Sequence, residues 1–122
     1  MSHRFILPIA VALALLPTAT AQAKPQTCKS ADLRYPFQPG GTKSFGVFKL
    51  TIEGGKCTTA HRIAKGWMKA FEDEIKHGRV KLPKSVEGYA FQSLDSHQAQ
   101  TYRLRGRKGA TTIRFDYRVP NG

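Results

Sequence analysis

The clearest alternation of apolar and polar side chains runs through residues 45–52. On an extended backbone, the residues on one side of this run are Phe48, Leu50 and Ile52, and those on the other are Val47, Lys49 and Thr51. A period of two predicts a half-buried β-strand, with one set on each face. Gly54 and Gly55 follow directly and mark the end of the strand.

A helical period begins immediately afterwards. Between Cys57 and about His77, apolar residues recur at steps of three and four, and they are Ala60, Ile63, Ala64, Trp67, Phe71 and Ile75. This stripe predicts an amphipathic helix, with Thr58 or Thr59 near its N-cap and Gly78 as the left-handed residue after its end. Because Trp67 falls in step with the stripe, we expect it in the core.

Three shorter alternating runs lie in the last third of the chain, at Gly88 to Leu94, Gln100 to Arg105 and Ala110 to Val119. The break between the last two, Gly106 to Gly109, is typical of a tight hairpin turn. The order of elements predicts an α+β domain: strand, helix, then a three-strand antiparallel meander, with the helix packed on one sheet face. Tyr89 and Phe91 are expected to point into the core, and the position of the first strand in the sheet is left open.

The first 23 residues differ from the rest. Arg4 precedes an apolar run of 12 residues, Phe5 to Leu16, and Ala21 to Ala23 matches a small-x-small cleavage site. This pattern predicts a secretory signal peptide over residues 1–23, because the run is too short for the roughly 20 residues that span a bilayer. We therefore expect a secreted protein, either free or held at a cell wall through its charge.

Prolines and glycines without a sustained apolar period fill residues 24–43, which predicts an irregular N-terminal arm before a single α+β domain over residues 44–120. Cys28 and Cys57 are the only cysteines. In an oxidising compartment they are expected to form a disulfide that ties the arm to the start of the helix and stabilises the fold by about 3–4 kcal/mol. We expect the arm to depend on this bridge alone.

The charge is strongly one-sided. The chain has 20 Lys and Arg against 8 Asp and Glu, a formal net charge of +12, and residues 24–122 alone retain +11. Such an excess either keeps a secreted protein soluble or attracts a polyanion: a nucleic acid, an anionic cell-wall polymer or an acidic polysaccharide. Both interpretations stay open at this point.

Arginines dominate the last two predicted strands. If Leu104 and Ile113 point inward, their arginine neighbours point outward on the opposite face, beside two cations at the expected hairpin tip. The residues predicted to bind a polyanion are Arg103, Arg105, Arg107, Lys108, Arg114 and Arg118. Arginine favours bidentate contacts with phosphate or carboxylate groups.

Catalytic patterns are weak. His61, His77 and His97 have no metal-ligand spacing, and no nucleophile or phosphate-loop motif is present, so we expect a non-enzymatic monomer without metal or cofactor. Two alternatives remain. The first is a protein-interaction or inhibitor domain that acts on an acidic secreted protein, with the Gly106–Gly109 hairpin as the inserted element. The second is a small secreted ribonuclease using Glu87, His97, Arg103 and Arg114.

Three stretches carry a resemblance: Phe48 to Trp67, Lys84 to Tyr89, and the Gly-x-x-x-Ile-x-Phe run at 109–115. Together they resemble small secreted actinobacterial proteins of unknown function over roughly residues 45–116. The resemblance implies one helix with an antiparallel sheet and a disulfide, and it implies no activity. Members often carry further cysteines where Phe91 and Leu104 stand here, so a second bridge is not expected.

Overall fold

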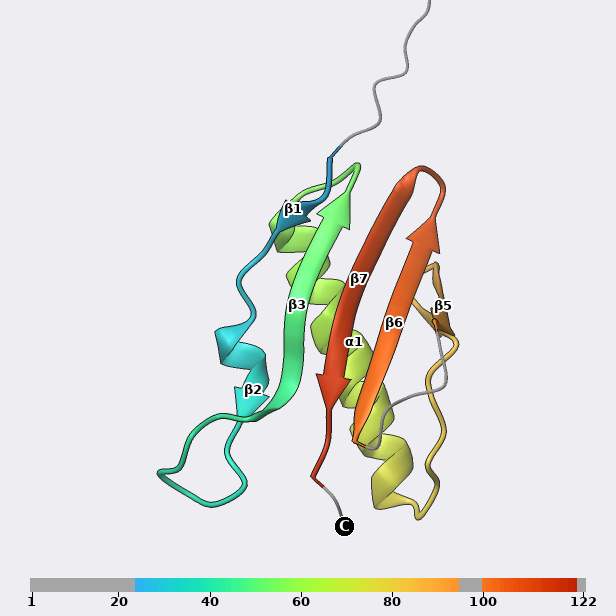
Figure 1. Ribbon diagram of the computed structural model, residues 1–122. Helices are drawn as coiled ribbons and strands as arrows, with labels where there is room; N and C mark the ends of the chain where they lie inside the picture. The colour runs from blue at the N-terminus through green and yellow to red at the C-terminus, as the bar shows by residue number, and fades with distance from the viewer. Residues whose placement is uncertain (1–23, 95–99, 121–122) are drawn as a thin grey trace, which may run out of the picture.

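One helix lies against one face of a seven-stranded antiparallel sheet (Figure 1). The computed structural model describes residues 24–94 and 100–120. The helix is α1 (Cys57–Lys76), and a short 3₁₀ turn, η1 (Ala31–Leu33), precedes it. The strands are β1 (Gln26–Thr27), β2 (Arg34–Tyr35), β3 (Phe45–Glu53), β4 (Ser85–Val86), β5 (Tyr89–Ser93), β6 (Thr101–Lys108) and β7 (Thr111–Arg118). The predicted α+β class is confirmed.

The strand order is β1-β3-β7-β6-β5-β4, with β2 also paired to β3. The first long strand, β3, therefore lies beside the last one, β7. The predicted strand-helix-meander arrangement is incomplete, because β1 and β2 lie in the arm expected to be irregular and β4 lies in the linker before the meander. These three strands have only two residues each, too few to show a period of two. The predicted signal peptide lies outside the described residues.

A bulge interrupts β3. Lys49 has a φ of +56°, and the pairing register with β7 shifts between Phe48 and Thr51. An extra residue in one strand changes which side chains face the core beyond it. Val47 and Leu50 are buried, so the prediction that Phe48 shares a face with Leu50 and Ile52 is wrong.

Helix α1 is bounded differently at its two ends. The residue at the N-cap is Lys56, which makes no side-chain capping bond, so the expectation of Thr58 or Thr59 there is wrong. At the C-terminus, the Gly78 N–H donates to Ile75 O and the Arg79 N–H donates to Glu74 O, each at 2.9 Å. Gly78 has a φ of +77°, as this Schellman ending requires. Ile75, assigned to the apolar stripe, is 44% exposed.

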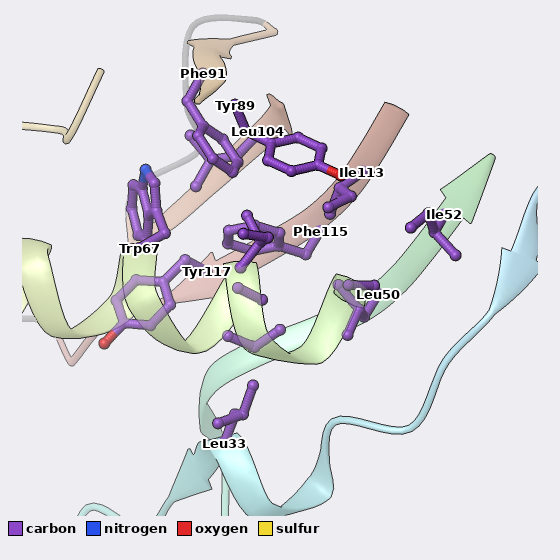
Figure 2. Close-up of a cluster of buried hydrophobic side chains, with 14 of the residues drawn as sticks. Leu33, Leu50, Ile52, Trp67, Tyr89, Phe91, Leu104, Ile113, Phe115 and Tyr117 are labelled. Carbon is purple, nitrogen blue, oxygen red and sulfur yellow. The ribbon is translucent and has the colours of Figure 1, made fainter. Parts of the chain in front are cut away.

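Trp67 is fully buried and lies among the aromatic side chains of the core (Figure 2). Its ring centroid is 5.3 Å from those of Phe71 and Tyr117 and 5.6 Å from that of Phe115. The indole N–H donates to Pro83 O at 3.1 Å, so the buried polar atom has a partner. The core position of Trp67 and the inward orientation of Tyr89 and Phe91 are confirmed.

The hairpin between β6 and β7 turns at Gly109–Ala110, not over Gly106–Gly109 as predicted. Gly106 lies inside β6, opposite Ile113, and a Cβ built on it would lie 2.5 Å from the Phe91 ring. Gly106 therefore makes room for the Phe91 ring in the core and does not form part of a turn. Arg107 and Lys108 are consequently strand residues.

Candidate functional site

The face of the sheet turned away from α1, here called the open face, carries all five arginines of β6 and β7. Leu104 and Phe115 lie directly opposite each other and are buried beneath α1, so the neighbouring pairs on both strands point the other way. These open-face pairs are Arg103 with Asp116, Arg105 with Arg114, Arg107 with Thr112, and Thr101 with Arg118.

The structure brings together five of the six cations predicted from the sequence. Lys108 is the exception, because it pairs with Thr111 on the helix side of the sheet. Its Nζ atom donates to Glu87 O at 3.2 Å and lies 5.6 Å from the ring centroid of Tyr89. The alternation of β6 continues through residue 108, which separates Lys108 from Arg107 and contradicts their expected grouping at a hairpin tip.

Two cations that were not among the six predicted, Arg34 and Lys49, also lie on the open face. The β3 bulge places Phe48 on this face, and the guanidinium groups of Arg34 and Arg118 lie over its ring, 4.2 and 4.1 Å from the centroid. Lys49 extends towards Asp116, with Nζ 3.9 Å from Oδ2. A local period cannot reveal these contacts, since they depend on the bulge and on the pairing of β2 with β3.

Two carboxylates accompany these cations among the described residues of the open face. Arg114 donates through Nη1 to Glu53 Oε1 at 2.8 Å. Asp116, whose side chain is only 9% exposed, lies between Lys49 and Arg103, whose Nε is 3.7 Å from Oδ1. The cations are Arg34, Lys49, Arg103, Arg105, Arg107, Arg114 and Arg118. Positive charge therefore remains on this face after every ion pair is formed.

Arg105 and Arg107 have no carboxylate partner among the described residues. Arg105 lies directly opposite Arg114, its Nη2 donates to Gln92 Oε1 at 2.9 Å, and its buried Nε has no acceptor in the described part of the chain. Arg107 is exposed next to Thr112. Like charges facing each other across two strands are unfavourable. Glu53 offsets the charge of Arg114, whereas no described carboxylate offsets that of Arg105, so an anion would be favoured at Arg105.

A hollow of about 370 Å³ opens on the same face. Its charged lining comes from Lys49, Arg103, Arg114 and Asp116, and Thr51 adds a hydroxyl. Leu94, Leu104 and Phe115 complete the lining. Three cations and one carboxylate give the hollow an excess of positive charge, which favours an anionic group.

The residues named for a ribonuclease are not brought together. The Glu87 carboxylate accepts a hydrogen bond from Arg62 Nε of the helix at 3.1 Å, whereas Arg103 and Arg114 point to the open face. His97 lies outside the described residues. Glu87 also has a φ of +47° in the tight turn between β4 and β5, a structural role for this position.

The two described histidines make local contacts. His61 Nε2 lies 2.7 Å from Asp32 Oδ2, and this hydrogen bond lowers the pKa of Asp32. His77 Nδ1 lies 2.8 Å from Asp73 O. Within residues 24–94 and 100–120, no group of three His, Cys, Asp or Glu side chains is placed to hold a metal ion.

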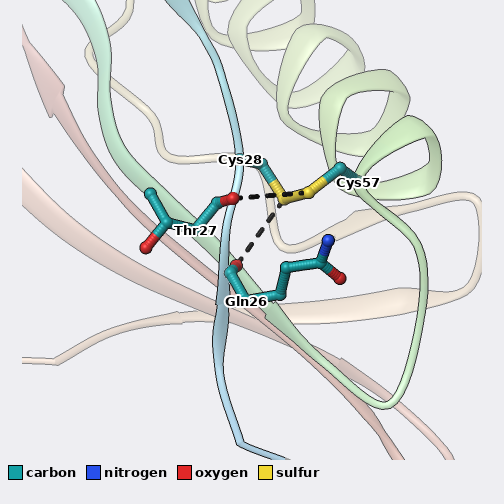
Figure 3. Close-up of a disulfide and its surroundings, with 4 residues drawn as sticks. All are labelled: Gln26, Thr27, Cys28 and Cys57. Atoms are coloured by element: carbon teal, nitrogen blue, oxygen red, sulfur yellow. Dashed lines mark hydrogen bonds between the residues drawn. A yellow bond between two sulfur atoms is a disulfide. The ribbon is translucent and has the colours of Figure 1, made fainter.

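The disulfide between Cys28 and Cys57 is confirmed, with Cα atoms 5.3 Å apart (Figure 3). It joins the end of β1 to the first turn of α1, and the carbonyl oxygens of Gln26 and Thr27 lie 3.6 Å from the two sulfur atoms. The arm does not depend on this bridge alone, however. Leu33 is 3% exposed in the core, and Ser30 Oγ donates to Val47 O at 2.8 Å.

An apolar groove of about 550 Å³ lies at the opposite end of the molecule from the disulfide, where α1 ends. Its apolar lining includes Tyr35, Phe71, Ile75, Val80, Tyr102 and Val119. Beside it, the Tyr117 hydroxyl donates to Glu72 Oε2 at 3.2 Å. Burial, followed by the neighbouring Tyr35 hydroxyl and Glu72 carboxylate, raises the pKa of Tyr117 well above its usual value.

Comparisons with protein-family models, with curated proteins and with solved structures found no match. The resemblance to small secreted actinobacterial proteins therefore stays a prediction. Among the described residues, no helix has the length and apolar character needed to cross a membrane.

Proposed function

We propose that this protein is a secreted, non-enzymatic module that binds a polyanion on its open face. The observation that carries the proposal is the excess of cations there: six arginines and one lysine accompany only Glu53 and Asp116 among the described residues. A sheet holds these side chains on a fixed frame, so a bound anion meets groups that are already in place.

The arrangement of the arginines favours an extended ligand. Arg103, Arg105 and Arg107 are alternate residues of β6, so their Cα atoms recur roughly every 6.8 Å along the strand. A row of cations at regular spacing fits a chain with repeated negative charges better than a single small anion. Binding of this kind releases counterions and weakens steeply as salt is added.

Secretion is supported by the disulfide, since such bonds persist in oxidising compartments. The apolar leader over residues 1–23 supports the same localisation from the sequence. An extracellular protein with a net charge of +11 over residues 24–122 meets anionic cell-wall polymers and polysaccharides there.

The proposal is tested by measuring heparin affinity of residues 24–122 over a range of salt concentrations. The open-face variant combines Arg105→Glu with Arg107→Glu, the two arginines that no described carboxylate neutralises. The matched control combines Lys65→Glu with Lys69→Glu on the exposed side of α1, which changes the net charge equally.

We expect the open-face variant to lose heparin affinity and to lower the slope of log affinity against log salt by about 1 per arginine that contacts the polymer. The control variant should retain most of the slope. Equal losses in both variants would show that only diffuse net charge acts, and a wild-type protein that does not bind heparin in low salt would refute the function.

One observation favours the alternative of protein interaction. Ile75 and Val80, which are 44% and 72% exposed, line the apolar groove, and exposed apolar patches mark interaction surfaces. The hairpin turn Gly109–Ala110 offers no comparable apolar element. A partner bound through this groove would be released by Val80→Asp and would be retained in high salt, unlike a polyanion on the open face.

A further inference from the structure

The open face has one aromatic side chain among the described residues of β3, β5, β6 and β7, and that ring is already covered. Phe48 is half-buried, and two guanidinium groups lie over it at 4.2 and 4.1 Å. On the helix side of the neighbouring strands, Tyr89, Phe91, Phe115 and Tyr117 are buried, and Tyr102 is partly buried against Phe71. Proteins that bind single-stranded nucleic acids use exposed rings as stacking platforms for the bases.

Three of the arginine planes are also engaged. Bases can stack on guanidinium groups as well as on rings. Those of Arg34 and Arg118 lie against Phe48, and that of Arg114 is held by Glu53 at 2.8 Å. Arg107 remains exposed. Among the described residues, the open face therefore offers charge and hydrogen-bond donors, but no exposed aromatic ring for a base.

The donors left for a ligand lie in one row. Arg105 and Arg107 are two residues apart on β6, and no described carboxylate neutralises either of them. Gln92 of β5 lies on the same side and accepts a hydrogen bond from Arg105. An anion at Arg105 would also relieve its repulsion from the facing Arg114.

We infer that the ligand of the open face is a base-free polyanion, recognised through the charged groups of its backbone, with Arg105 and Arg107 contacting successive groups. This inference rests on the proposed function and narrows its ligand class. A sulfated glycan and a polymer of phosphate esters share this chemistry. Single-stranded nucleic acid differs from them because it adds bases, for which the described residues of this face provide no exposed aromatic ring.

The experiment compares two oligonucleotides of equal length, one of thymidylates and one entirely abasic, together with heparin and inorganic polyphosphate. The two oligonucleotides share a phosphodiester backbone, so their difference in affinity reports the bases alone. Heparin and polyphosphate distinguish sulfate from phosphate sources. All four are measured at one ionic strength against the wild-type protein and against the double variant Arg105→Gln with Arg107→Gln.

We expect the abasic and thymidylate oligonucleotides to bind within about twofold of each other, because no base is stacked. A stacking site would lose roughly 5- to 150-fold in affinity for each base removed. The double variant should bind all four ligands with lower affinity than the wild-type protein. The control variant Lys65→Gln with Lys69→Gln should lose much less affinity. The variant Phe48→Leu, which removes the ring but keeps an apolar side chain, should leave the ratio between the two oligonucleotides unchanged.

Two results would overturn the base-free ligand while leaving polyanion binding intact. One is a wild-type protein that binds the thymidylate oligonucleotide but not the abasic one. The other is a Phe48→Leu variant that loses affinity for the thymidylate oligonucleotide only. Undiminished binding by the Arg105→Gln, Arg107→Gln variant would overturn the assignment of these two contacts. Absence of binding to all four ligands would refute the proposed function itself.

Discussion

Gly106 illustrates how a single residue in β6 determines core packing. Its missing side chain leaves room for Phe91 of β5, whose Cζ would lie 2.5 Å from any Cβ at this position. Phe91 in turn lies 6.0 Å from the Phe115 ring and 6.4 Å from Trp67. The backbone of Gly106 is an ordinary strand conformation, so the requirement for glycine comes from space and not from φ.

We expect Gly106→Ala to lower the free energy of unfolding by about 1–3 kcal/mol, as overpacking of a core does. The measurement is a denaturant titration followed by the fluorescence of Trp67. The double variant Gly106→Ala with Phe91→Leu should lose less free energy of unfolding than the sum of the losses in the two single variants. The smaller leucine side chain frees the space that the alanine methyl group needs. Strict additivity of the two losses would contradict a direct clash.

At the scale of elements, the arm before β3 is held in two places. Near its start, the Cys28 N–H donates to Leu50 O at 2.8 Å, next to the disulfide with Cys57. Further along, Leu33 enters the core and Arg34 Nε donates to Val47 O at 2.9 Å. The disulfide therefore secures β1, whereas packing and hydrogen bonds secure η1 and β2.

Replacing both cysteines by alanine should lower the free energy of unfolding by about 3–4 kcal/mol, since the bridge closes a loop of 29 residues. Amide hydrogen exchange should accelerate most at residues 26–28 and less at residues 31–35 and in the middle of α1. A uniform acceleration over residues 24–35 would show that the bridge holds the whole arm. The double replacement avoids leaving one reactive thiol.

For the molecule as a whole, the balance of charge opposes folding. The ion pairs on the helix side, such as Arg62 with Glu87 and Arg79 with Glu74, have largely exposed cations and contribute little to stability. The net charge of +12 adds repulsion that every compact arrangement of this chain must overcome. Added salt screens both the repulsion among the excess cations and the attraction within the few surface ion pairs. We expect the loss of repulsion to be the larger effect.

We expect the melting temperature of residues 24–122 to rise as sodium chloride increases from about 10 to about 300 mM, with most of the change at the low end, where the screening length falls fastest. Circular dichroism of the helix provides the measurement. The Lys65→Glu, Lys69→Glu variant has a net charge lower by four, because it loses two positive charges and gains two negative ones, and it should show a smaller rise. A melting temperature that falls with salt would mean that the ion pairs outweigh the net repulsion.

The local pattern of apolar and polar residues was sufficient to predict those elements that are long enough to show a helical or strand period. The helix from Cys57, its glycine ending at Gly78, the long strands and the outward arginines of β6 and β7 all follow from steps of two or of three and four. The disulfide was also predictable, because two cysteines allow one intramolecular pair. Except for the disulfide, these features depend on neighbours in the chain, and those neighbours are visible in the sequence.

Tertiary structure decided what depends on contacts between distant segments. The pairing of β3 with β7, the short strands of the arm and the placement of Gly106 beneath Phe91 all involve residues far apart in the chain. The bulge at Lys49 places Phe48 on the open face, where Arg34 lies over its ring, and it reverses the sides to which Val47 and Phe48 of β3 were assigned. A strict alternation cannot anticipate such a bulge, because its stabilising contacts come from another strand.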